Sequence, residues 1–239
     1  MNAPLPRPIA GAAAFVTGAN RGLGRAFVRG LLNRGASTVY AAARDPRNID
    51  VEDDRIVAIA LDITREDQVA EAARTCGDTA LLINNAGLMR GVTFTNAPDL
   101  GAARAEMETN YFGTLMMSLA FAPVLARNGG GALVNILSVT SFFANPFNGT
   151  YCASKSAEWA LTNALRIELR SRDTAVVGVH AGFIDTDMAS GVDDEKISPS
   201  DVVDQTLDAV ESGRPEVLTD EETRQIKLSL PQDQTAIYP

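Results

Sequence analysis

The sequence predicts a single-domain α/β fold, with a central parallel sheet of about seven strands, doubly wound, and helices on both faces. Short apolar runs alternate with longer amphipathic segments. The runs are apolar at nearly every position, as expected for parallel strands that are covered on both sides. No internal repeat and no stretch rich in Pro, Gly or Ser divides the 239 residues. Right-handed crossovers then produce the doubly wound arrangement.

Four strands and two helices are expected in the first third of the chain. One face of the first helix is formed by Phe27, Val28, Leu31 and Leu32, and Gly35 ends it. Thr64 is the expected N-cap of the second helix. The expected strands span 12–18, 37–43, 55–62 and 79–87, and the expected helices span 24–36 and 65–75.

The remaining chain continues the alternation. Two long helices are expected, each followed by a strand, and the more polar last quarter adds two helices around a short strand. The expected strands are 131–138, 175–182 and about 216–218, and the expected helices are about 100–127, 148–171, 200–212 and 220–229.

Composition and charge exclude several classes of function. The protein has a net charge of −9 and a pI of about 4.7. Its negative charge would repel phosphate backbones, so nucleic-acid binding is not expected. The chain contains no apolar run of 18 residues, the length needed to span a bilayer, and no basic run suited to an anionic membrane surface. One histidine, His180, and two separated cysteines predict neither a metal site nor a Ser–His–Asp triad.

The two thiols suit a reducing compartment, so a cytoplasmic protein is expected. Residues 1–10 contain three prolines and are expected to form a loose N-terminal arm, while residues 11–239 form the single domain.

A glycine-rich turn, "VTGANRGLGRAF" at 16–27, joins the first strand to the first helix. At such a turn Gly18, Gly22 and Gly24 allow the backbone to approach a pyrophosphate, and the helix N-terminus supplies N–H donors. The alternative is a loop that merely needs positive φ angles. The position at the first crossover favours a dinucleotide site.

The end of the second strand predicts which cofactor binds. An acidic residue in this region would accept a hydrogen bond from the ribose 2′-OH of NAD(H). Here Ala43 and Arg44 occupy it, and Asp45 lies one step farther on. The planar guanidinium of Arg44 suits a 2′-phosphate, and Arg21 offers a second cation. The sequence therefore predicts NADP(H); the alternative is a solvated Arg44 with Asp45 on the ribose.

Five motifs in order resemble the short-chain dehydrogenase/reductase family over roughly residues 10–190. The glycine turn is followed by "NNAG", by "NYFG" with Asn110, and by "NILSVTS" with Ser138. Tyr151 and Lys155 follow in "TYCASK", 13 and 17 residues after the serine. These four polar residues resemble the catalytic tetrad of the family, and the chain is most similar to its NADPH-dependent carbonyl reductases.

The resemblance also implies a Rossmann-type site along the carboxyl ends of the strands. Asp62 and Ile63 would meet the adenine, and Ile184 and Thr186 the nicotinamide side. All the residues expected at the cofactor are Gly18, Asn20, Arg21, Gly22, Leu23, Gly24, Arg44, Asp62, Ile63, Asn85, Ala86, Gly87, Tyr151, Lys155, Ile184 and Thr186.

Two departures from the family pattern have expected consequences. Ala181-Gly182 replaces the usual Pro-Gly, which should loosen that turn modestly. The C-terminal segment lacks the usual Gly-rich ending. A homodimer or a homotetramer is expected, with assembly through the C-terminus in doubt.

The spacing of Tyr151 and Lys155 supplies the chemistry, because residues four apart share one face of a helix. A free phenol has a pKa of about 10, and a nearby ammonium together with oxidised nicotinamide lowers it. The phenol can then act as a general acid or base. The resemblance implies that Ser138 holds the carbonyl oxygen and that Asn110 holds a water linking Lys155 to solvent.

The predicted function is hydride transfer between NADP(H) and a ketone, aldehyde or secondary alcohol of small size. The alternatives are a catalytically silent NADP(H)-binding regulator, and an epimerase or dehydratase of nucleotide sugars, for which little chain follows residue 190. A substrate lid is expected at about 187–212. The expected apolar substrate lining is Leu88, Met89, Phe142, Phe143, Phe147, Phe183 and Met188.

Overall fold

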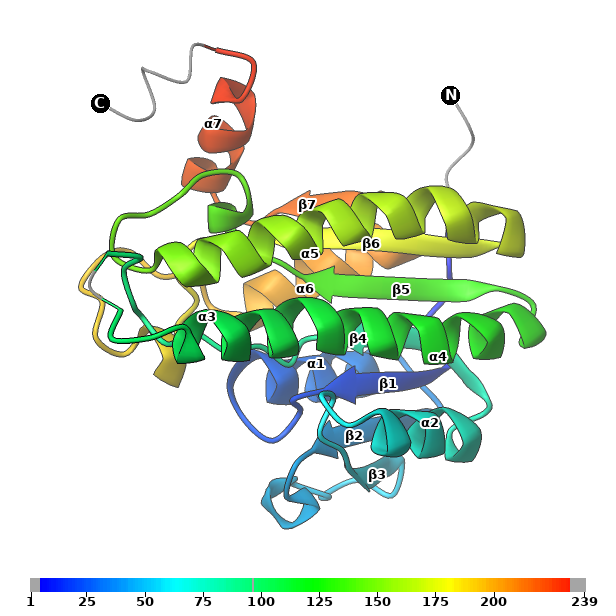
Figure 1. The fold of residues 1–239 in the computed structure, drawn as a ribbon. Coiled ribbons are helices and arrows are strands. Elements are labelled where there is room, and N and C mark those ends of the chain that lie inside the picture. Colours follow the sequence, from blue (N-terminus) through cyan, green and yellow to red (C-terminus); the bar gives the residue numbers. More distant parts are fainter. Residues whose placement is uncertain (1–4, 96, 233–239) are drawn as a thin grey trace.

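The structure, a computed structural model, describes residues 5–95 and 97–232. Its centre is one sheet of seven strands in the order β3-β2-β1-β4-β5-β6-β7, with every neighbouring pair parallel. The predicted doubly wound fold is therefore confirmed (Figure 1). The strands are β1 Ala13–Thr17, β2 Thr38–Ala43, β3 Ile56–Ala60, β4 Thr79–Asn84, β5 Gly131–Ile136, β6 Thr174–His180 and β7 Glu216–Leu218.

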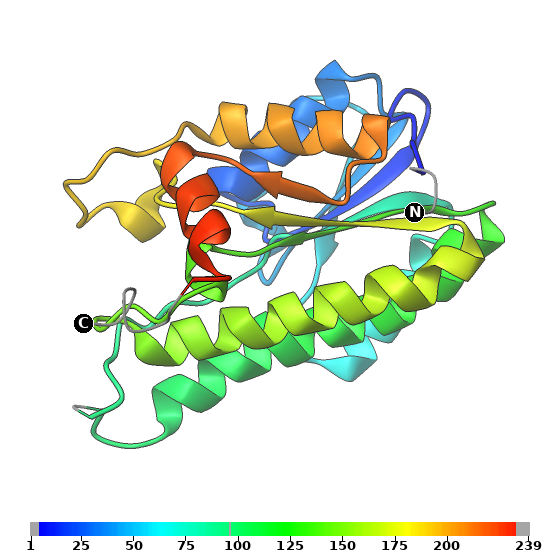
Figure 2. The same ribbon diagram turned by 90° about the horizontal axis from the view of Figure 1, so that it is seen from above.

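Helices cover both faces of the sheet. Figure 2 shows α1 and α6 on one side and α4 and α5 on the other, where α2 also packs against α4. The short helix α7 follows β7 and lies at the carboxyl ends of the strands (Figure 1). The helices are α1 Gly22–Asn33, α2 Glu66–Thr75, α3 Gly101–Glu106, α4 Thr114–Arg127, α5 Gly149–Glu168, α6 Pro199–Ser212 and α7 Glu221–Ser229.

The core has one apolar cluster on each face of the sheet. Along β1, Ala14 and Val16 point into the cluster under α1 and α6. Phe15, between them, points into the cluster under α2, α4 and α5. Alternate side chains of a strand point to opposite faces, so a strand covered on both sides must be apolar throughout, as its sequence is.

The strand order reverses between β1 and β4. In open parallel sheets the crevice outside the carboxyl ends at such a switch point is the usual ligand site. Thr17 ends β1 and Asn84 ends β4, so the glycine turn and the "NNAG" motif meet at this crevice.

Thr64 does not cap α2, so that prediction was wrong. The helix begins at Glu66, with Arg65 at the N-cap and no capping bond from its side chain. Instead, the amide and the hydroxyl of Thr64 both donate to Oδ1 of Asp62, at 3.0 and 2.7 Å. The Asp62 carboxylate, two residues earlier, thus forms an Asx turn. It binds the Thr64 side chain, which therefore does not reach the N–H groups at the start of α2.

The expected loose N-terminal arm is partly packed. The amide of Arg7 donates to the carbonyl oxygen of Val210 at 3.0 Å, and Ile9 is 1% exposed within the core. Burial of this isoleucine side chain favours docking of residues 5–10, against the expectation. Residues 1–4 of the arm lie outside the described residues.

The segment expected as a lid, 187–212, contains a helix of the core. Its second half is α6, whose Val202, Val203 and Leu207 are buried in the core, so this part is a structural helix. The segment before α6 is held by a bridge between Ile184 and Ile197 and by an ion pair between Asp187 and Arg21. Within the described residues, no helix combines the length and apolarity that a bilayer crossing requires.

Candidate active site

The glycine turn requires its glycines for two different reasons. Gly18 and Gly22 have φ angles of +65° and +51°, which favour a residue without a Cβ. Gly24 has no positive φ, but a Cβ there would lie 2.1 Å from the carbonyl oxygen of Gly18. The turn therefore closes on itself, with Arg21 and Gly22 exposed at the start of α1.

The turn also fits a pyrophosphate at the start of α1. Arg21 occupies the N-cap and makes no capping bond with its side chain, so the first-turn N–H groups keep their donor capacity. The amide side chain of Asn85 donates to the carbonyl oxygens of Thr17 and Gly18, at 2.9 and 3.2 Å. The "NNAG" segment thus fixes the turn from the other side of the crevice.

The adenine end of the crevice carries the candidate cofactor-selecting residues. Arg44 is exposed, and no partner of its guanidinium is found in the described part of the chain. Arg47 binds the neighbouring Asp45 with two side-chain bonds, at 2.9 and 2.8 Å, and holds the pKa of that carboxyl below its usual value. Arg21 instead pairs with Asp187 at 3.1 Å, and both are exposed.

The two expected adenine contacts have other partners. The carboxylate of Asp62 is bound by Thr64, as described above. Ile63 is 6% exposed, and its side chain packs where a Cβ on Gly113 would lie, at 2.7 Å. Only part of either residue is therefore free to contact a nucleotide base.

Three of the four candidate catalytic residues converge at the carboxyl end of β5. Tyr151 and Lys155 lie on one face of α5, with Nζ 5.9 Å from the centre of the phenol ring. The Ser138 side chain lies close enough to the phenol to lower its pKa. A hydroxyl, a phenol and an ammonium therefore meet at one point, as the sequence predicted.

Ser138 is held in place from several sides. It caps the short 3₁₀ helix Val139–Ser141, and its Oγ accepts bonds from the amide and the hydroxyl of Thr140, at 3.2 and 3.0 Å. Its own hydroxyl hydrogen remains to be donated. Nδ1 of His180 lies 3.3 Å from the carbonyl oxygen of Ser138, so the buried histidine supports the serine from behind.

Asn110 lies in a π-helical turn, Met107–Gly113, that interrupts the long helix expected at 100–127. Its Oδ1 accepts from the amide of Leu88 at 2.7 Å, and its Nδ2 donates to Leu88 O and to Ser154 Oγ at 2.9 and 2.8 Å. Such turns are often found at functional sites. The side chain thus joins the segment after "NNAG" to α5, while the water relay stays a prediction.

Sequence reasoning missed Glu158. This residue is 1% exposed, and its Oε2 lies 2.6 Å from Nζ of Lys155. Burial opposes the charge of Lys155, but the adjacent carboxylate and Tyr151 outweigh it and raise the lysine pKa above its ordinary value. A signal was present, because positions 151, 155 and 158 fall on one helical face.

The phenol of Tyr151 is less acidic than predicted. Burial raises its pKa above the ordinary value, and this outweighs the lowering by Lys155. The carboxylate of Glu158 raises it further, while the Ser138 side chain lowers it. The expected effect of the ammonium is therefore present, but in the protein alone it does not dominate.

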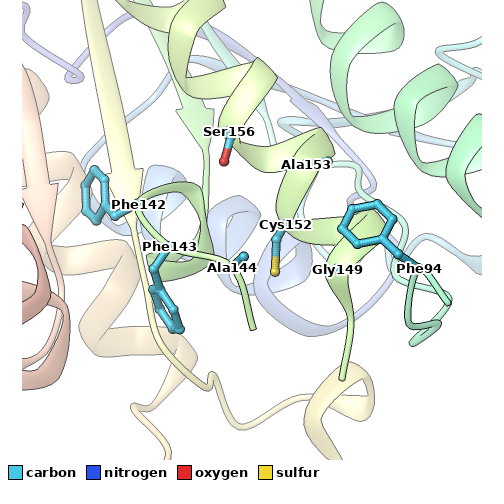
Figure 3. A pocket seen from close by; sticks show the side chains of 8 residues that line it. All are labelled: Phe94, Phe142, Phe143, Ala144, Gly149, Cys152, Ala153 and Ser156. Carbon is cyan, nitrogen blue, oxygen red and sulfur yellow. The ribbon is translucent and has the colours of Figure 1, made fainter. Parts of the chain in front are cut away.

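A pocket of about 250 Å³ lies beside the start of α5 (Figure 3). Of the predicted apolar lining, only Phe142 and Phe143 border it. Phe147, Phe183 and Met188 are exposed, at 75%, 37% and 50%. The pocket lies on a neighbouring face of α5 from the phenol, because successive residues are about 100° apart around a helix. Its lining is Phe94, Phe142, Phe143, Ala144, Gly149, Cys152, Ala153 and Ser156.

The family model for short chain dehydrogenases matches residues 12–197, which include the glycine turn and all four candidate catalytic residues. The chain belongs to the short-chain dehydrogenase family. The family members are oxidoreductases, and the parallel seven-stranded sheet of this short-chain dehydrogenase agrees with that membership.

Named relatives agree with this membership. The short-chain dehydrogenase is 27% identical to an uncharacterised oxidoreductase of Staphylococcus saprophyticus, over 83% of this chain and 90% of that one. It is 31% identical to a bovine dehydrogenase/reductase SDR family member 7B, over 82% and 65% of the two chains.

Solved structures are similar as well. A short chain dehydrogenase from Burkholderia cenocepacia, in complex with NADP, is 43% identical with a TM-score of 0.92, over 96% of this chain and 97% of that one. One from Burkholderia phymatum, in complex with NAD, has a TM-score of 0.85 at 23% identity, over 96% and 95%. One of these similar structures thus contains NADP and the other NAD.

The turn after β6 is firmer than its missing proline suggested. The amide of Gly182 donates to Oδ2 of Asp220 at 2.9 Å, and the same carboxylate caps α7 through the amide of Thr223. The C-terminal helix of this short-chain dehydrogenase therefore anchors the Ala181-Gly182 turn that borders the crevice.

Proposed function

We propose that the protein is an NADP(H)-dependent carbonyl reductase, or alcohol dehydrogenase in the reverse direction. The observation that carries this proposal is the convergence of the Ser138 hydroxyl, the Tyr151 phenol and the Lys155 ammonium at the carboxyl end of β5. Polar side chains that could be solvated at the surface are here gathered beside the crevice of the glycine turn.

Each residue has a role that follows from its contacts. Ser138 directs its hydroxyl toward the carbonyl oxygen of the substrate, and Tyr151 donates its proton to that oxygen. When bound, a reduced nicotinamide would supply the hydride to the carbonyl carbon and thereby complete the alcohol. Lys155 uses two N–H groups on Ile136 O and Glu158 and has a third for the cofactor ribose. Gly87 lies next to Lys155 and Asn110: a Cβ there would be 3.8 Å from Nζ of Lys155 and 3.5 Å from Oδ1 of Asn110.

The preference for NADP(H) is supported by the cations at the end of β2. Asp45 is occupied by Arg47, so its carboxylate is a poor acceptor for a ribose 2′-OH. Arg44 is exposed next to it and offers a guanidinium to a 2′-phosphate. Arg21 would have to leave Asp187 to contribute.

The substrate proposed is a small, hydrophobic ketone or aldehyde. Support comes from the apolar side chains around the crevice mouth, where Phe183 and Met188 follow β6 and are 37% and 50% exposed. The protein is further proposed to form an oligomer through α4 and α5, on which Leu119 and Ile167 are 62% and 78% exposed. Light scattering of the purified protein measures the oligomeric state.

The function is tested by following NADPH absorbance while a panel of ketones and aldehydes is offered, with NADH in parallel. The proposal predicts that several hydrophobic carbonyl compounds are reduced and that kcat/KM is higher with NADPH. Consumption of neither cofactor with any member of a broad panel would contradict the catalytic proposal. A higher kcat/KM with NADH would contradict the cofactor preference alone.

A further inference from the structure

The Glu158 carboxylate is a buried charged group that the proposed mechanism does not use. It lies on α5, where its Oε2 is 2.6 Å from Nζ of Lys155 and its Oε1 accepts from the hydroxyl of Thr114 at 3.1 Å. Both charged side chains of the pair are at most 5% exposed. A buried ion requires partners of this kind, because its loss of hydration is otherwise uncompensated.

The pair fixes the direction of the ammonium. Lys155 donates one N–H to the carbonyl oxygen of Ile136 at 2.9 Å and another to Glu158. An ammonium has three donors, so one remains for the crevice. With one anchor on β5 and one on its own helix, Nζ is held at a set distance from the ring of Tyr151.

The pair also sets the charge next to the phenol. Besides Lys155 and Glu158, the Ser138 hydroxyl interacts with it, while the Cys152 thiol lies on the neighbouring face of α5, against Asn145 and Asn148. From β6, His180 supports Ser138, and burial lowers its pKa to about 3, so it is neutral at physiological pH. From the helix on the other side, Thr114 contributes an uncharged hydroxyl.

Burial raises the pKa of Glu158, against the lowering by Lys155. We nevertheless treat the two as an ion pair, since the contact of 2.6 Å and the raised pKa of the lysine both correspond to a charged carboxylate. In that state the two charges at Tyr151 largely cancel.

We propose that Glu158 is a positioning residue, which clamps the Lys155 ammonium and offsets its charge, so that Tyr151 holds its proton more tightly than it would beside Lys155 alone. This inference rests on the proposed function. Carbonyl reduction must begin with a protonated phenol, and alcohol oxidation with a phenolate. The site is therefore poised to begin reduction near neutral pH, while oxidation needs alkaline conditions; the equilibrium of the reaction itself is unchanged.

The titration of Tyr151 tests this inference without a substrate. Protein labelled with ¹³C at the tyrosine ζ position is titrated by NMR, both alone and saturated with NADP⁺, and Y151F assigns the resonance among the four tyrosines. The variant E158Q removes the charge but keeps an oxygen acceptor for Lys155. The matched control is E168Q, the same substitution at an exposed position of the same helix.

The proposal predicts that E158Q lowers the titration midpoint of Tyr151 by about one to two pH units. This is the size expected for removing a unit charge roughly 6 to 12 Å away at an effective dielectric of about 20. E168Q should leave the midpoint where it is in the wild type. An unchanged or raised midpoint in folded E158Q would overturn the proposal.

If E158Q does not fold, the double variant K155M/E158L replaces it, because it removes both charges and leaves no unpaired ion. Cancellation of the two charges predicts a Tyr151 midpoint within about half a pH unit of the wild type. A rise of about one unit or more would show that Lys155 acts without an offset, and would refute the role of Glu158.

The outcome is separable from that of the proposed function. A lowered midpoint in E158Q together with no reduction of any carbonyl compound would refute the catalytic proposal and leave the charge coupling standing. Reduction of carbonyl compounds together with an unchanged Tyr151 midpoint in E158Q would refute the role of Glu158 and leave the catalytic proposal standing.

Discussion

Replacing His180 should remove part of the acid sensitivity of the fold. The ring is fully buried and stacks on Phe142, with centroids 4.1 Å apart. Its Nε2 has no hydrogen-bond partner within the described residues. Glu216 is 3.6 Å away, but its carboxylate is bound by Lys227 at 2.8 Å. Lys227, Arg166 and Lys155 all disfavour a charged imidazole, and burial, the largest cause, lowers the pKa from 6.5 to about 3.

The sign of the effect follows from proton uptake. Between about pH 6.5 and pH 3 the unfolded chain binds a proton at this histidine and the folded protein does not. The contribution of His180 to the free energy of unfolding is therefore complete above pH 6.5 and is lost progressively as the pH falls. One pKa unit corresponds to about 1.4 kcal/mol, so the free energy of unfolding should fall by about 2 kcal/mol from this group between pH 6.5 and pH 5.

The assay is urea unfolding of the wild type and H180N at several pH values between 7.5 and 5. H180N keeps a side-chain N–H donor but does not titrate, so its absolute stability matters less than its slope with pH. We expect the difference in unfolding free energy between the two proteins to change by about 2 kcal/mol over this range. Parallel curves would refute the claim that this histidine is buried in its neutral form.

Two further substitutions test the cofactor site. G24A should abolish NADPH binding in fluorescence titrations, because its Cβ would lie 2.1 Å from a backbone oxygen of the turn. The control is G191A, where a Cβ meets nothing within 4 Å, and it should bind NADPH as the wild type does. Normal NADPH binding by G24A would contradict the role of the glycine turn. R44A should weaken NADPH binding about tenfold or more and leave NADH binding nearly unchanged, as expected for a lost charge-assisted bond. R74A is its control, since it removes an exposed arginine in the last turn of α2, and equal losses for both cofactors in R44A would argue against a 2′-phosphate contact.

The fold and the pairing of Tyr151 with Lys155 could be predicted because they follow from local pattern, while the position of Ser138 beside them was implied by the family resemblance. A strand that is apolar at every position must be covered on both sides, and the ends of parallel strands meet at one edge. Helical spacing placed the phenol and the ammonium together. These properties depend on residue order and not on the details of packing.

Other features depended on contacts between distant segments. The π turn at Asn110 forms where its side chain binds the Leu88 backbone and Ser154, and no period in the sequence indicates it. Thr64 was expected as a cap, but the carboxylate of Asp62 binds it. The pKa of Tyr151 depends on how deeply three side chains are buried, which helix spacing alone does not give.

Tyr151 can be tested directly by comparing Y151F with C152A, since Cys152 is the next residue of α5 but borders the neighbouring pocket. The measurement is NADPH consumption with the best carbonyl substrate, alongside NADPH affinity by fluorescence. A lost general acid should lower kcat at least about 100-fold in Y151F while NADPH still binds, and C152A should turn over like the wild type. Wild-type turnover in Y151F would contradict the proton-transfer role on which the proposed function depends.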